Sequence, residues 1–218
     1  MAQLFSPGTN SLARITLGAI LVAPVPAFWL SYELTRSSYT TRVGEAVEQP
    51  VPFSHEHHVS GLGIDCRYCH TSVEESSFAG FPPTKTCMTC HSQIWTNARL
   101  LEPVRRSWET GLPLPWVRVH NLPDYVYFDH GIHINKGVGC NVCHGAVERM
   151  PLTFKTQTLQ MQWCLDCHRQ PERYLRPREE VFNFAYQPPA DQLALGRRLV
   201  EEYGIRTDRL DDCYICHR

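Results

Sequence analysis

The 218-residue sequence has no block of like charges and few segments with the alternating pattern of β-strands. Its 21 Lys and Arg nearly balance its 22 Asp and Glu, for a net charge of −1 at pH 7. Nucleic-acid-binding proteins usually carry a basic patch or tail, so the composition gives no reason to expect a nucleic-acid partner. The shortage of strand patterns excludes a fold built mainly on a sheet, and we expect short helices and irregular segments.

No cysteine is left over for a disulfide, because all ten lie in five C-x-x-C-H motifs. This pattern is typical of covalent c-type haem attachment. Positions i, i+3 and i+4 share one face of a helix, so both cysteines can form thioethers with one porphyrin while the histidine binds its iron. The predicted attachment residues are Cys66, Cys69, Cys87, Cys90, Cys140, Cys143, Cys164, Cys167, Cys213 and Cys216, and the predicted proximal ligands are His70, His91, His144, His168 and His217.

Zinc is the alternative ligand for C-x-x-C pairs. Zinc sites would not require a histidine directly after every second cysteine, and five pairs cannot combine evenly into four-cysteine sites. We therefore predict five covalent haem c groups. With so few residues for each cofactor, the porphyrins would supply much of the buried apolar surface, and the chain without haem should fold poorly.

An internal repeat indicates where the distal ligands lie. Residues 53–70 and 128–144 both read F-x-H-x-x-H, then Gly-x-Gly, then C-x-x-C-H, which suggests two related halves at 53–127 and 128–218. Two histidines at i and i+3 cannot share the one remaining axial position of a single iron, so each pair should serve two haems. The predicted distal ligands are His55, His58, His130 and His133, with His120 as the fifth.

The fifth ligand has competitors. Met150 and Met161 could replace His120, since methionine also binds haem c iron and raises its potential. The remaining histidine outside the motifs, His57, is interpreted as a solvated neighbour of His58. The chain therefore has enough candidate distal ligands for all five irons, which favours a function in electron transfer. A multihaem reductase with one open iron, or a quinol dehydrogenase acting alone, are the alternatives.

One uncharged stretch, residues 15–32, is long enough to cross a bilayer and ends in interfacial aromatics. Pro24 and Pro26 would kink it, which membrane helices tolerate. A cleaved signal peptide is the alternative, but the long apolar run and weakly basic start favour a retained anchor. We expect a cytoplasmic segment at 1–14, a single-pass transmembrane helix at 15–32, a linker at 33–52 and exported haem-binding halves beyond it. An amphipathic helix is expected at 191–203.

The sequence resembles the pentahaem cytochrome c subunit of alternative complex III, a bacterial quinol:acceptor oxidoreductase. The resemblance rests on the apolar stretch, FSHEHH before the first motif, PWVRVHNLPDYVYFDHGIH at 115–133, CHGAVERM at 143–150, LQMQWCLDCHR at 159–169 and the terminal CYICHR. Cytochrome subunits of other membrane oxidoreductases share some of these segments.

The resemblance implies a place in the bacterial cytoplasmic membrane, with the haem region on the periplasmic side. It also implies menaquinol oxidation by a polytopic partner subunit, passage through an iron–sulfur subunit, and a monohaem cytochrome c subunit or a soluble periplasmic cytochrome or copper protein as acceptor. On this interpretation the chain carries electrons and is not itself catalytic.

Overall fold

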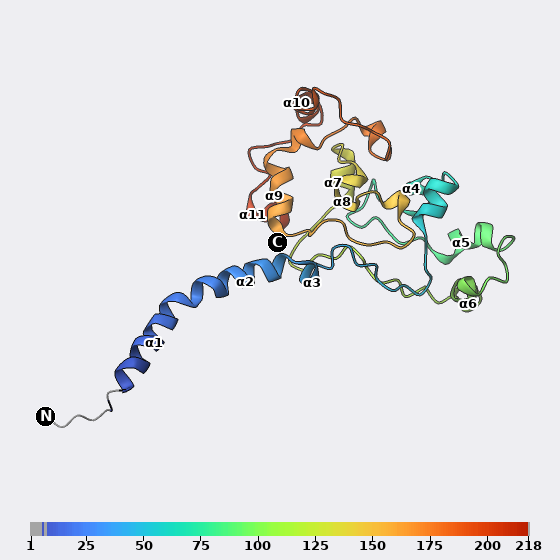
Figure 1. The fold of residues 1–218 in the computed structure, drawn as a ribbon. Helices are drawn as coiled ribbons and strands as arrows, with labels where there is room; N and C mark the ends of the chain where they lie inside the picture. Colours follow the sequence, from blue (N-terminus) through green and yellow to red (C-terminus); the bar gives the residue numbers. More distant parts are fainter. Residues whose placement is uncertain (1–5, 7, 218) are drawn as a thin grey trace. The chain divides into compact units, whose positions relative to one another are not determined.

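The computed structural model describes residue 6 and residues 8–217, in two compact units that divide after Arg42 (Figure 1). Residues 1–5 and 7, which belong to the expected cytoplasmic segment, and Arg218 lie outside the described residues.

The first unit is a long apolar helix in two segments, α1 (Gly8–Val22) and α2 (Pro24–Arg36), followed by the single turn α3 (Ser38–Thr41). The helical hydrogen bonds continue through the junction, because the amide of Ala23 donates to the carbonyl of Ala19 at 2.8 Å and that of Ala27 to Ala23 at 3.1 Å. The helix bends where these segments meet (Figure 1). Both prolines fall in the first turn of α2, where a missing amide donor costs least.

The helix Gly8–Arg36 is longer than the apolar run that predicted it, because the polar residues on either side contain no helix breaker. Its 29 residues have a mean hydropathy of 1.6 in the most apolar window, and none of that window is buried. At 1.5 Å per residue it is about 43 Å long, more than the hydrocarbon thickness of roughly 30 Å. By length and composition it can cross a membrane, a property that it shares with signal sequences.

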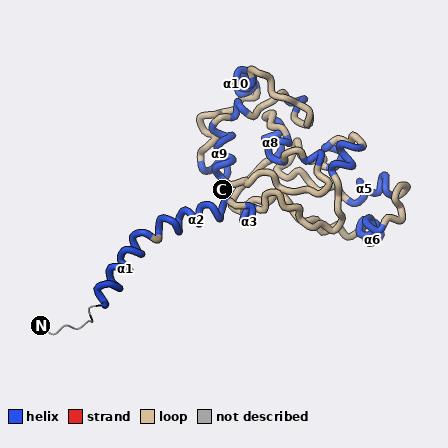
Figure 2. The backbone as a smooth tube through the Cα atoms, in the orientation of Figure 1, coloured by secondary structure: helices blue, strands red, loops and turns tan. Residues whose placement is uncertain are grey.

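The second unit consists of short helical pieces joined by long loops (Figure 2). No β-strand occurs in residues 43–217, only three isolated bridges. The expectation of a mostly helical and irregular fold is confirmed. The helices are α4 (Cys66–Cys69), α5 (Thr84–His91), α6 (Glu102–Thr110), α7 (His130–Asn135), α8 (Cys140–His144), α9 (Met161–Arg169), α10 (Gln192–Glu202) and α11 (Cys213–Cys216), with a π-helical turn at Glu56–Gly61 and 3₁₀ turns at Arg99–Leu101, Val147–Arg149, Pro171–Arg173 and Arg178–Glu180.

The hydrophobic core of this unit is small and divided. One cluster contains Val73, Ile134 and Val181, and the other contains Leu175, Leu199 and Tyr203. The second cluster holds α10, the helix that was expected at 191–203, against the 3₁₀ turn at Pro171–Arg173. Each cluster contains only three buried side chains, which is a small apolar core for a unit of this size. A small core agrees with the expectation that porphyrins supply much of the buried apolar surface.

The two repeats pack on each other reciprocally. In the first, the π-helical turn bonds to the loop after the third motif: the amide of Glu56 donates to Met150 O at 3.1 Å, and the Ser60 hydroxyl to Glu148 O. In the second, α7 packs on the loop after the first motif, where the amide of Gly131 donates to Ser76 O at 3.0 Å. This exchange brings the histidines of both repeats into the same part of the unit.

Candidate functional site

The cysteines of every C-x-x-C-H motif lie in a turn of helix, in α4, α5, α8, α9 and α11. The helix includes the histidine in α5, α8 and α9, whereas His70 and His217 are the first residues after α4 and α11. In α4 the carboxylate of Asp65 caps the turn by accepting the amide of Arg67 at 2.8 Å. The cysteines of each motif therefore lie one helical turn apart on a shared face, the arrangement that two thioethers to one porphyrin need. Among residues 6 and 8–217, no three or more His, Cys, Asp or Glu side chains converge as they would around a metal ion.

The histidine rings are oriented by hydrogen bonds at Nδ1. The Nδ1 atoms of His58, His133 and His130 lie 2.7–2.9 Å from the backbone carbonyls of Ser54, Asp129 and Ser77. The motif histidines His70, His91, His168 and His217 use the carbonyls of Gly80, Ile94, Leu210 and Tyr125 in the same way. A carbonyl can only accept, so Nδ1 carries the proton and the Nε2 lone pair is available to a metal.

Three pairs of these rings have the spacing that a shared iron requires. Ring centroids are 6.3 Å apart for His58 and His91, 6.4 Å for His130 and His144, and 6.2 Å for His133 and His168. With metal–nitrogen bonds of about 2 Å and centroids about 1.2 Å behind each nitrogen, two axial imidazoles on one metal are separated by roughly 6.3 Å. The residues therefore fit haem iron ligated by two histidines.

Two further histidines lie close to motif histidines. Burial lowers the pKa of His55 to about 4, and the neighbouring imidazole of His70 lowers it as well. His120 packs edge-on against His144, with centroids 4.2 Å apart, and its Nε2 is buried with no hydrogen-bond partner. Burial, followed by the imidazoles of His120 and His130, lowers the pKa of His144 to about 3. Rings with such low pKa values are neutral at pH 7, which is the metal-binding form.

The cysteine pairs follow one another through the unit in a continuous series. The Cys69 thiol interacts electrostatically with Cys87, and Cys66 with Cys140. Burial and then the thiols of Cys167 and Cys164 raise the pKa of Cys143 to about 12. Burial and then Cys216 raise the pKa of Cys164. Such interactions weaken steeply with distance, so the motifs neighbour each other in the order second, first, third, fourth, fifth.

Arg176 supports the third motif, although nothing in its sequence context predicts this role. Its buried guanidinium donates to Asn141 Oδ1 at 2.8 Å, inside the motif, and to the carbonyls of Glu180 and Asn183. It lies so close to Gly139 that a Cβ there would overlap it. The second Gly of the Gly-x-Gly sequence is thus explained by this close approach of a charged side chain.

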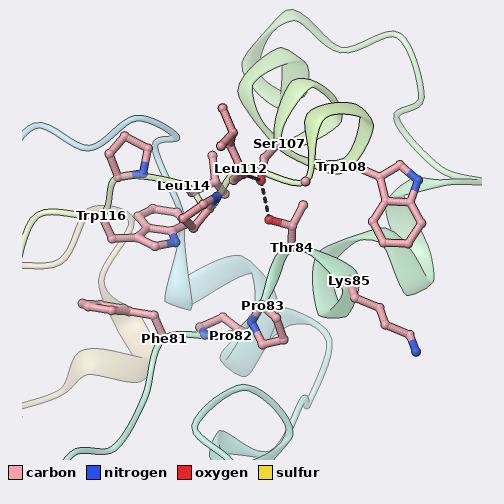
Figure 3. A pocket seen from close by; sticks show the side chains of 13 residues that line it. Phe81, Pro82, Pro83, Thr84, Lys85, Ser107, Trp108, Leu112, Leu114 and Trp116 are labelled. Atoms are coloured by element: carbon pink, nitrogen blue, oxygen red, sulfur yellow. Dashed lines mark hydrogen bonds between the residues drawn. The ribbon is translucent and has the colours of Figure 1, made fainter.

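An open cavity of about 580 Å³ adjoins the N-terminal end of α5, the helix that carries the second motif. Figure 3 shows Phe81, Pro83 and Trp116 around it, and the hydroxyls of Thr84 and Ser107 joined by a 2.6 Å hydrogen bond. Neither Cys87 nor His91 lines this cavity, so it lies beside the motif and is not the attachment site.

Comparison with known proteins agrees with the site. Residues 126–218, which hold the last three motifs, match the family described as cytochrome c7 and related cytochrome c. The multiheme cytochrome c subunit of menaquinone reductase from Nitratidesulfovibrio vulgaris (strain Hildenborough) is 30% identical over 170 residues, which cover 68% of this chain and 77% of that protein. The chain is thus a member of the multihaem cytochrome c family.

Proposed function

We propose that this chain is a membrane-anchored pentahaem cytochrome c that relays electrons within a quinone-reactive complex. The observation that carries the proposal is the set of paired imidazoles at iron spacing, each beside a C-x-x-C-H turn. Bound haem iron supplies reversible one-electron chemistry. The chain contributes five pairs of attachment cysteines, and Nδ1 hydrogen bonds orient most of the axial histidines.

The ligand assignment follows from the neighbours of each motif histidine. His58 would share a haem with His91, His130 with His144, and His133 with His168, as the ring spacing supports. His55 is the candidate for His70, its electrostatic neighbour. The i, i+3 histidines of each repeat would then serve two different haems.

The order of the motifs supports a relay through the unit. In this order the second motif, Cys87–His91, and the fifth, Cys213–His217, stand at the two ends, with the other three between them. Each neighbouring pair of motifs is near enough for its thiols to interact electrostatically. Electrons could therefore cross the unit by way of its own cofactors, from one end of the series to the other.

We place this relay in a complex resembling alternative complex III, with a polytopic quinol-oxidising subunit, an iron–sulfur subunit and a monohaem cytochrome c or soluble acceptor. The relative from N. vulgaris is named as a subunit of a menaquinone reductase, which supports a quinone-reactive complex. The helix Gly8–Arg36 would hold the chain in the cytoplasmic membrane. The second unit, which holds the five motifs and is called the haem unit, would face the periplasm, because haem is attached covalently outside the cytoplasm.

Isolation of the native complex tests this placement. The chain should co-purify from detergent-solubilised membranes with an iron–sulfur subunit and a polytopic subunit, and its haems should be reduced when menaquinol is added to that complex. Recovery of the chain alone, together with haem reduction only by donors other than quinols, would contradict the assignment. A complex that reduces menaquinone but does not oxidise menaquinol would instead match the activity named for the relative.

A further inference from the structure

The fifth motif differs from the second, third and fourth in the ring that its histidine contacts. In the described residues, the ring contact of His217 is with Tyr125, at 5.9 Å between centroids and an interplanar angle of 27°. The carbonyl of the same tyrosine accepts from His217 Nδ1 at 3.1 Å. The carbonyl of Tyr125 therefore holds Nδ1 and leaves Nε2 of His217 available to a metal.

The five histidines proposed as distal ligands all lie beside other motifs. Three of them face His91, His144 and His168 at iron spacing, and His55 neighbours His70. His120, the expected fifth ligand, packs against His144 at 4.2 Å, a separation too short for an iron between the two rings. His120 is thus next to the third motif, which leaves the iron of the fifth motif to another residue.

Methionine is the other residue type suited to haem c iron, and the sequence has four. Met1 is outside the described residues, and Met88 lies between the two cysteines of its own motif. Met150 is only 4% exposed, and its backbone is hydrogen-bonded to Val147 and Glu56 in the loop after the third motif. Met161 is 65% exposed, so no other part of the described chain encloses its thioether.

The position of Met161 suits the fifth motif. It is the first residue of α9 and lies one helical turn before Cys164, on the same face of that helix. Cys164 is the cysteine whose thiol neighbours Cys216 of the fifth motif. The carbonyl of Leu210, just before the fifth motif, also holds the ring of His168 in α9. These contacts bring the start of the fifth motif to the helix that begins with Met161.

The backbone before Met161 is strained. Leu159 has a φ of 57°, in the left-handed region that bulky side chains avoid. Strain of this kind persists where the surrounding structure requires it, and it clusters at functional sites. Here it lies two residues before α9, the helix that begins with Met161.

We propose that the thioether of Met161 is the distal ligand of the iron held by His217. The inference rests on the proposed five-haem function and refines it: four haems would have two histidine ligands and the C-terminal one a histidine and a methionine. Methionine ligation raises the reduction potential of haem c. The C-terminal haem, at one end of the series, would be the most oxidising of the five and the site from which electrons leave the chain.

The test uses the full-length chain with its haems, purified in detergent. The oxidised protein should show the near-infrared methionine-to-iron charge-transfer band. Met161→Leu, which keeps the size and helix preference of the side chain, should abolish this band and create one CO-binding haem per chain. Met161→His should also abolish the band but keep every haem low-spin, with the potential of one haem lowered. The matched control, Met150→Leu, should retain the band and bind no CO.

The outcomes separate this proposal from the proposed function. A wild-type protein without the band, or a Met161→Leu variant that keeps it, overturns the ligand assignment. CO binding by the wild type overturns it too, because one iron would then be open. In each case a haem count of five by pyridine haemochrome would leave the relay proposal standing, whereas a lower count would remove that proposal as well.

Discussion

Replacement of His58 by alanine tests the pairing of histidines on the irons. His58 and His91 have ring centroids 6.3 Å apart, and a carbonyl holds the Nδ1 of each ring. The methyl group of alanine cannot reach across that gap, so one iron would lose its sixth ligand and leave room for CO. With one of five haems affected, about a fifth of the low-spin absorbance should be lost, and the reduced protein should bind one CO per chain.

The neighbouring His57 provides a matched control. It lies on the same π-helical turn but is exposed, and its ring stacks on Trp95 at 5.7 Å between centroids. His57→Ala should leave the low-spin spectrum unchanged and bind no CO. Both variants should keep the full haem count, because the thioethers are made by Cys87 and Cys90. A His58→Ala protein that stays entirely low-spin, or a His57→Ala protein that binds CO, would refute the pairing.

Three other predictions concern stability and location. Gly145→Ala should lower the free energy of unfolding of the haem unit in urea by about 2–4 kcal/mol, because φ 64° and ψ −154° suit only glycine and a Cβ would lie 2.6 Å from the methyl group of Thr156. The control Gly63→Ala, at φ 68° with open space around it, should lower it by about 1 kcal/mol. Equal losses in the two variants would contradict the close contact at Gly145. The side-chain hydrogen bond from Arg67 lowers the pKa of Asp65 in the folded chain. The ionised carboxylate therefore stabilises the fold above the unfolded pKa of about 3.9, and this stabilisation is lost as the pH falls through the lower folded pKa. Asp65→Asn should therefore be less stable by under about 1 kcal/mol at pH 7, with no deficit in acid, and a deficit that persists in acid would exclude this cause. Replacement of residues 1–42 by a cleavable signal peptide, which keeps export and haem attachment, should release a soluble protein with unchanged haem spectra. The full-length chain should resist alkaline washing of membranes. A natural protein that is soluble and begins beyond the apolar helix would indicate a signal peptide.

Much of the local structure could be predicted from the sequence. The C-x-x-C-H spacing predicts a helical turn, and the cysteines of each motif lie in one. The stripe of Leu195, Leu199 and Tyr203 predicts a helix that ends before Gly204, and α10 has this form with Gly204 at φ 59°. The uncharged run predicts the long N-terminal helix, though not its full length. These features depend on neighbours within a few residues, where spacing and side-chain chemistry decide the conformation.

The arrangement of the motifs in space could not be predicted in the same way. The first motif lies between the second and the third because the two repeats exchange contacts, as between Glu56 and Met150, and such contacts leave no mark on spacing. The position of His120 against His144 depends on the same tertiary packing. Counting histidines shows how many side chains could serve as distal ligands, but not which iron each histidine can reach.

On the proposed function, the chain carries five covalent haem c groups, one for each C-x-x-C-H motif. The most direct measurement is the intact mass of the matured protein, combined with the pyridine haemochrome of the same sample. We expect a mass that exceeds that of the polypeptide by five haem c groups, and a haemochrome count of five. A mature protein with three or fewer haems would contradict a continuous series of cofactors through the unit.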